Sequence, residues 1–154
     1  MSEEQVPVSV PSTDPFALAI PVSRQVQIRN IILSESASRR TSKAAAILDD
    51  FSPTIQIAQV HHVADREAKS LIVVVPLKLI VEEDGDKPIE HVRISATFIL
   101  FYRVDSYEGI EEENLEAFAS MNGVFNAWPY WREYVQSMAV RMGLPPIVVP
   151  VHRI

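Results

Sequence analysis

Cysteine is absent from this sequence of 154 residues, and glycine is rare, with four residues in all. The first absence excludes disulfides, thiolate nucleophiles and thiolate metal sites. The second excludes the glycine-rich loops that bind phosphates and dinucleotides, whose spacing these glycines do not provide. The sequence also contains neither a GxSxG nucleophile elbow nor a Ser, His and Asp set that local patterns bring together. We therefore predict no catalytic residues and do not expect an enzyme.

Long apolar runs and a surplus of positive charge are missing as well. The longest apolar run, from Leu71 to Leu77, is far shorter than the roughly 20 residues that span a bilayer. No basic segment followed by an apolar stretch and a cleavage site opens the sequence, so we expect a cytoplasmic protein. The formal net charge is −6, which leaves no basic excess to displace counterions from a nucleic acid. Neither a membrane nor a nucleic acid is expected as a partner.

The histidines and acidic residues show no pattern of metal ligands. His61 and His62 are adjacent, so on a strand they would point to opposite faces, and no second ligand recurs at a suitable spacing. Residues 105–116 are rich in carboxylates but lack the spacing of a calcium loop. We expect them to precede a helix, because carboxylates favour its amino end. Neither a metal nor a cofactor is predicted, and His91 and His152 are expected to be solvated.

The first two thirds of the chain predict an arm and four strands. Prolines at positions 7, 11, 15 and 21 indicate a mobile arm over residues 1–22, followed by a single domain over residues 23–154. Alternating apolar side chains predict strands at residues 25–35, 54–63, 69–83 and 89–104. Asp84 and Gly85 supply the turn of a hairpin between the last two strands. Residues 36–50 are predicted to form a loop.

Two helices are predicted after the strands, the first over residues 111–124 and the second beginning at Ala127. The first is expected to break near Asn122 and Gly123. Gly143, followed by two prolines, is expected to stop the second. The second helix has one apolar face, with residues at alternating spacings of three and four: Trp128, Trp131, Val135, Met138 and Met142. The whole pattern indicates an α+β domain, a four-stranded antiparallel sheet followed by two helices packed on one face.

The strand predicted over residues 69–83 is apolar on both faces. Leu71, Val73 and Val75 alternate with Ile72 and Val74, so helices on one side can cover only one of two apolar surfaces. Apolar patches of more than a few hundred Å² are rare on the surface of monomers. Symmetric homo-oligomers are the usual way to cover them. We therefore expect a second copy of the chain on the uncovered surface.

The last helix and the segment after it resemble the carboxy-terminal signature of SecB-type chaperones. The residues that carry the resemblance are Pro129, Tyr130, Arg132, Glu133, Ser137, Met138, Arg141, Gly143, Pro145 and the apolar tail to Pro150 and Val151. The resemblance implies an ATP-independent holding chaperone that binds unfolded or nascent polypeptides. It also implies a homotetramer, a dimer of dimers in which first strands meet at one interface and first helices at another. The interface residues expected on this basis are Val92, Ile94, Ala96, Phe98 and Phe118.

A chaperone of this kind needs apolar area, adaptable side chains and exposed backbone in place of one shaped pocket. Aromatic and thioether side chains supply the area and the adaptability. The client-binding residues that we predict are Ile55, Ile57, Tyr130, Trp131, Tyr134, Met138, Met142, Leu144 and Ile147. Packing of the helix on the sheet explains Trp131, Val135 and Met138 more simply than binding does, whereas the two explanations fit Tyr130 and Tyr134 equally well.

The sequence also departs from the SecB pattern. The family's tail continues into an apolar helix and an acidic, metal-binding extension that docks on the export motor ATPase, whereas this sequence stops at Ile154. Trp131 stands where the family has a small residue. A partnership with the motor in protein export is therefore less expected than in the family. The alternatives are a chaperone dedicated to one client such as an antitoxin, a phage-encoded variant, a non-catalytic interaction subunit, or a small enzyme with scattered residues.

Overall fold

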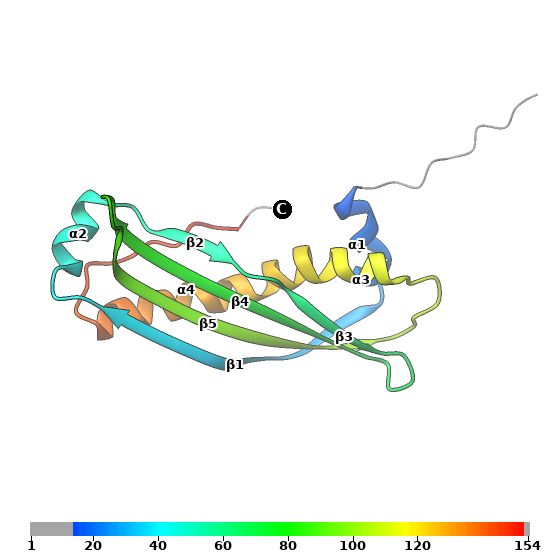
Figure 1. Ribbon diagram of the computed structural model, residues 1–154. Helices are drawn as coiled ribbons and strands as arrows, with labels where there is room; N and C mark the ends of the chain where they lie inside the picture. The colour runs from blue at the N-terminus through cyan, green and yellow to red at the C-terminus, as the bar shows by residue number, and fades with distance from the viewer. Residues whose placement is uncertain (1–13, 153–154) are drawn as a thin grey trace, which may run out of the picture.

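A twisted antiparallel sheet packs against a long helix in a computed structural model that describes residues 14–152 (Figure 1). The second layer is made by the helices that follow the last strand. The elements, in chain order, are α1 (Pro15–Ser23), β1 (Val26–Arg40), α2 (Ala44–Asp50), β2 (Thr54–Ile57), β3 (His61–Asp65), β4 (Ser70–Glu83), β5 (Ile89–Val104), α3 (Glu112–Phe118), the π-helical turn η1 (Ala119–Gly123) and α4 (Val124–Arg141). None of these helices has both the length and the apolar character needed to cross a bilayer.

The strand order across the sheet is β1-β5-β4-β2, and β3 also pairs with β4. Every pairing is antiparallel. The predicted α+β class is thus confirmed, with five strands where four were predicted. The hairpin of β4 and β5 lies where the alternation placed it. β1 is longer than predicted and extends to Arg40, so residues 36–40 belong to a strand and residues 44–50 to α2, where we had predicted a loop.

Pro76 accounts for the extra strand. Its carbonyl oxygen accepts a hydrogen bond from the Ala58 amide, at 3.0 Å. In an antiparallel ladder the N–H and C=O of one residue face the same neighbouring strand. The nitrogen of Pro76, which carries no hydrogen, therefore faces the junction of β2 and β3. A proline cannot donate the return bond of that pair. The ladder stops at this point, and the strand predicted over residues 54–63 becomes two.

The core lies between the sheet and the helices that follow it. Alternate residues of β4 and β5 are buried there, together with Leu115, Phe118, Val124, Trp131 and Val135. The residues predicted for the oligomer interface, Val92, Ile94, Ala96, Phe98 and Phe118, are all in this core. Their placement corrects the prediction, because the chain's own helices cover that face of β5 and leave these side chains no surface for another subunit.

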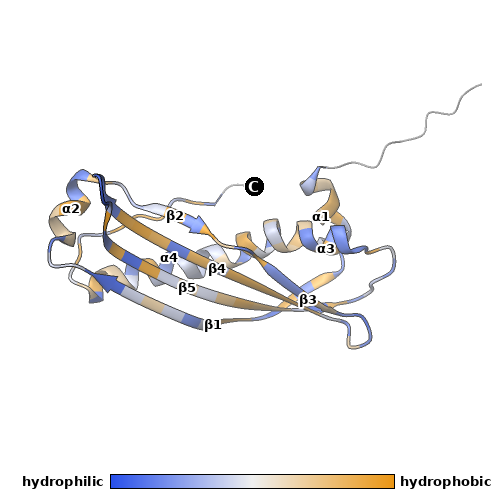
Figure 2. Cartoon of the chain, in the orientation of Figure 1, coloured by the Kyte–Doolittle hydropathy of each residue, from blue (hydrophilic) through white to orange (hydrophobic). Residues whose placement is uncertain are grey.

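The opposite face of the sheet carries the surplus apolar surface. Ile72 and Val74 of β4 and Ile99 and Phe101 of β5 are only half-buried there, and Ile99 pairs with Ile32 of β1, which is exposed. Figure 2 shows β4 as a nearly continuous hydrophobic strand in the middle of this face. The expectation that one strand has two apolar faces and that the helices cover one of them is confirmed.

The predicted helix break near Gly123 is wrong. α3, η1 and α4 follow each other as one continuous helical segment (Figure 1). Gly123 serves close packing, because a Cβ atom there would lie 2.7 Å from Cγ1 of Val73 in β4.

Asn126 lies inside α4, where its amide donates a hydrogen bond to the Tyr102 hydroxyl at 2.9 Å. Burial raises the pKa of Tyr102 to about 12.

The predicted arm is partly a helix. Residues 1–13 lie outside the described part of the chain, but residues 15–23 form α1. Asp14 caps α1 by accepting a hydrogen bond from the Phe16 amide at 3.0 Å, and Pro15 occupies the first turn, where its missing N–H costs nothing. Ala19 and Val22 are buried, and Asn114 of α3 donates to the Leu18 carbonyl at 3.0 Å. The prolines that suggested an arm are therefore compatible with a docked helix.

Candidate functional site on the two flanks of the last helix

Helix α4 presents three sides to its surroundings. The side that faces the sheet carries most of its buried residues, Val124, Ala127, Trp131, Val135 and Ala139. Tyr130, Tyr134 and Met138, four residues apart, lie together along one flank, which we call the aromatic flank. Trp128 and Arg132 lie on the other side, which contacts the chain after α4 and which we call the tail flank. These two flanks are the candidate binding surfaces.

The aromatic flank is accessible and lies towards β1. Tyr130 is 50% exposed, and its ring centroid lies 6.5 Å from that of Phe98. Phe98 pairs in the ladder with Leu33 of β1, which is an exposed large hydrophobic residue as well. Tyr134 is half-buried. The flank and the neighbouring strand together expose apolar and aromatic side chains beside the free edge of the sheet.

Trp131 separates from the other predicted client-binding residues. Its side chain is fully buried, and its ring is stacked on Tyr134 with a centroid distance of 6.4 Å. Its indole nitrogen has no hydrogen-bond partner among the described residues. Trp131 therefore supports Tyr134 from the core and offers no surface to a client, which corrects the prediction that it binds one.

The chain after α4 is an extended tail that runs back along the helix. Gly143 ends α4 in the left-handed conformation, with φ 64°, as predicted, and Arg40 donates a hydrogen bond to the Met142 carbonyl at 2.6 Å. Residues 144–152 then run back beside α4, and in the view of Figure 1 this tail crosses β2. The buried residues of this tail are Leu144, Ile147 and Val149. Leu144 and Ile147, which we predicted to bind clients, are thus covered by the chain itself.

Two side chains of the tail flank hold the backbone of the tail. The Trp128 indole nitrogen donates to the Pro150 carbonyl at 2.6 Å, and Nε of Arg132 donates to the Val149 carbonyl at 3.1 Å. The ring of His152 lies 4.8 Å from the Trp128 ring, so His152, which we predicted to be solvated, is half-buried. The sequence alone did not predict that Trp128 and Arg132 bind the tail. Only the fold brings these two hydrogen-bond donors next to the tail carbonyls.

The two predicted residues of β2 lie away from the aromatic flank. Ile55 is half-buried against the core, and Ile57 is exposed. Ile57 borders a surface cavity of about 640 Å³ that His61, His62 and Glu116 also line. Within residues 14–152 no three histidine or acidic side chains gather in a way that could hold a metal ion. The predicted client-binding set is therefore divided between two sides of α4 and the core.

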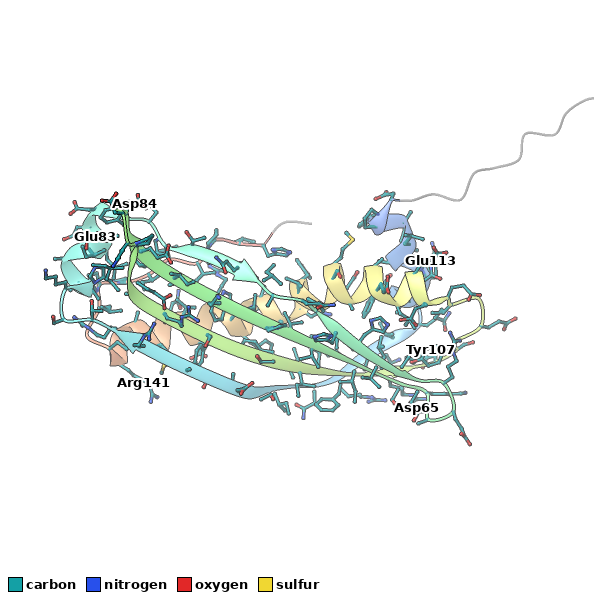
Figure 3. All side chains as sticks on the ribbon, viewed as in Figure 1. Asp65, Glu83, Asp84, Tyr107, Glu113 and Arg141 are labelled. Atoms are coloured by element: carbon teal, nitrogen blue, oxygen red, sulfur yellow. The ribbon has the colours of Figure 1, made fainter. Side chains whose placement is uncertain are left out.

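Several charged groups that lie away from the aromatic flank are paired with each other. Hydrogen bonds from Arg93 and then Arg39 hold the pKa of Glu90 at about 2, and they offset the repulsion between these two arginines, which pair in the ladder. His91, predicted to be solvated, is buried between the Thr41 hydroxyl and Glu83. The labelled charged side chains lie at the two ends of the molecule, Glu83, Asp84 and Arg141 at one and Asp65 and Glu113 at the other (Figure 3). Among the residues that define the two flanks, Arg132 of the tail flank is the charged one.

The fold is shared with a SecB-like chaperone of Mycobacterium tuberculosis, whose structure holds a ChAD peptide from the HigA1 antitoxin. The TM-score is 0.74 at 20% sequence identity, over 90% of this chain and 98% of that chain. A protein of unknown function from Streptococcus agalactiae matches with a TM-score of 0.47 and 12% identity, over 82% of this chain and 97% of that one. No model of a protein family matches the chain, and no curated protein matches it. The first likeness shows a SecB-like fold.

Proposed function

We propose, from the SecB-like fold and the side chains beside α4, that this protein is an ATP-independent holding chaperone for unfolded polypeptides. The observation that carries the proposal is the aromatic flank, where Tyr130 is half exposed next to Leu33 of the edge strand. Aromatic rings bind apolar segments of many shapes, and Met138 adds a flexible thioether. Several weak contacts of this kind combine into useful affinity.

A dedicated client is favoured over general export. The structural neighbour from Mycobacterium tuberculosis was solved with a peptide from an antitoxin, and a segment of an antitoxin is a client that an extended apolar surface could accept. A protein that serves one client should bind that client far more tightly than other unfolded chains. Measuring affinity for a panel of unfolded proteins, with antitoxin segments among them, separates this form of the proposal from a general chaperone.

Removal of the Tyr130 side chain is the direct test of the aromatic flank. Tyr130→Ala should weaken the binding of an unfolded reporter protein about threefold to tenfold, the loss typical of an aromatic contact at an interface. It should change the melting temperature little, because half of the side chain is already in solvent. The measurements are suppression of reporter aggregation without nucleotide, and a thermal scan.

Val140→Ala is the matched control for that variant. Val140 lies on the same helix, is 77% exposed, and is not part of either flank. It should leave reporter binding unchanged. Equal effects of Tyr130→Ala and Val140→Ala would contradict the assignment of the flank, and failure of the unaltered protein to hold any unfolded polypeptide would contradict the proposed function.

We also propose that two copies pair through β1 and assemble further into a tetramer. β1 is 15 residues long, pairs only with β5 within residues 14–152, and is mostly exposed. Long free edges are templates for pairing with another chain, and exposed Ile32 lies on this strand. This proposal replaces the interface predicted on β5, whose side chains are buried.

A charge on β1 should disrupt that assembly. Ile32→Asp places like charges near each other across a two-fold strand pair, so the mass measured by light scattering at micromolar concentration should fall from that of the oligomer. Val63→Asp, on β3 at the other edge of the sheet and exposed, should leave the mass unchanged. A monomeric unaltered protein, or equal effects of the two variants, would contradict pairing through β1.

A further inference from the structure

The tail behaves as a peptide bound to the tail flank of α4. We propose that this flank is a second binding site for an extended apolar polypeptide segment, and that residues 147–152 fill it as an internal, displaceable ligand. The proposal rests on the proposed function, because the competing ligand is a client segment. It goes beyond that function in naming a second site and the contact that regulates it.

The first argument is the way in which the tail is held. Trp128 and Arg132 donate to two consecutive carbonyls, those of Pro150 and Val149. Such bonds recognise an extended backbone without reading its sequence. Sequence preference comes from alternate side chains: Ile147 and Val149 are buried, whereas Val148 between them is 80% exposed. Hydrogen bonds to the main chain combined with sites for alternate side chains are the general mode in which proteins bind extended peptides.

The second argument is that the tail can leave without breaking the fold. Past Leu144, no described residue of the tail makes a hydrogen bond between backbone groups. The tail is therefore not a strand of the sheet, and β2 keeps its ladder with β4 when the tail detaches. The remaining attachments are the two side-chain donors, the His152 ring on Trp128, and the buried Ile147 and Val149. A client segment with apolar residues at alternate positions can replace each of these contacts.

The consequence is an affinity set by competition. While the tail occupies the flank, a client reaches the site only in the fraction of molecules whose tail is released, and its apparent affinity falls by that fraction. A client that binds both flanks of α4 displaces the tail, whereas a client that binds the aromatic flank alone leaves it in place. The tail thus sets a threshold for the length and apolar content of a retained segment.

The test compares two adjacent positions in the full chain. Val149→Asp puts a charge on the buried side of the tail and should release it, whereas Val148→Asp puts the same charge on the exposed side and should not. A synthetic peptide of residues 147–154, IVVPVHRI, is the probe. We expect Val149→Asp to bind this peptide about tenfold more tightly than the unaltered protein and than Val148→Asp do. Titration is followed by calorimetry.

Further variants decide whether the gain belongs to this site. Adding Trp128→Phe, which removes the donor to Pro150, should abolish most of the gain. If Val149→Asp does not fold, the double variant Ile147→Ala with Val149→Ala weakens the tail without a charge and should show the same gain. Equal affinity of the released variants and Val148→Asp for the peptide would overturn the inference, as would a gain that survives Trp128→Phe.

The outcome is separable from that of the proposed function. If the released variants gain nothing while Tyr130→Ala still weakens reporter binding, the second site is wrong and the chaperone function stands. The third outcome concerns the mass of the oligomer measured by light scattering. If Val149→Asp lowers this mass and Val148→Asp does not, the tail holds two copies together. The flank is then occupied by the tail of a second copy, and the inference is overturned.

Discussion

Trp131→Ala is expected to lower the free energy of unfolding by about 3–5 kcal/mol, the usual cost of truncating a large aromatic side chain in a core. The Trp131 side chain is among the largest that are fully buried in the chain, and its ring supports that of Tyr134. Urea or thermal unfolding followed by circular dichroism measures the loss. Binding of an unfolded reporter should fall only as far as the folded fraction falls.

Trp131→Phe and Tyr130→Ala are the controls for this result. The phenylalanine keeps most of the apolar volume and removes an indole N–H that has no partner within the described residues, so its cost should be well below that of alanine. Tyr130→Ala should show the reverse profile, with weaker client binding and nearly unchanged stability. If Trp131→Ala were stable but failed to bind clients, the core role of Trp131 would be contradicted and a direct role in client binding would be supported.

Gly123→Ala should destabilise the protein by about 1–3 kcal/mol, the range found for overpacked cores. The added Cβ atom would lie 2.7 Å from Cγ1 of Val73, and Val73 is fixed in the middle of β4 with no exposure. Relief of the contact requires a shift of η1 or of β4, and either shift disturbs the packed core. Chemical denaturation of the variant measures the cost.

A double-mutant cycle assigns that cost to the contact. Val73→Ala removes Cγ1, so the double variant with Gly123→Ala should lose less stability than the sum of the two single losses, an interaction energy of about 0.5–3 kcal/mol. Gly85→Ala is the control, since a Cβ atom at Gly85 meets no atom closer than 4.0 Å. Strict additivity in the cycle would show that the cost of Gly123→Ala has another origin.

The two flanks of α4 differ in whether a polypeptide segment already covers them. The aromatic flank is open beside β1, whereas the tail flank already binds an extended segment of the chain itself. In this structure the same long helix therefore carries one accessible surface and one that the tail covers. This arrangement explains why residues predicted as a single client-binding set, such as Tyr130 and Ile147, differ so much in exposure.

Local patterns in the sequence determined the class of fold and several of its elements. The alternation over residues 69–83 and 89–104, with Asp84 and Gly85 between them, was sufficient to place the β4–β5 hairpin, because a strand with a buried face must alternate. Gly143 was sufficient to mark the end of α4, because it adopts the left-handed conformation that glycine tolerates best. The apolar faces of α4 and of the hairpin follow from the same periodicities.

Tertiary contacts decided which of those apolar residues are covered and by what. Phe98 and Trp131 became core residues because α4 crosses β5, and Ile147 became buried because the tail folds back on Trp128 and Arg132. Gly123 lies in a continuous helical segment, and it packs so closely on β4 that no room is left for a Cβ atom. Periodicity shows that a face is apolar, but its partner lies far away in the sequence, so burial is fixed only when distant segments pack together.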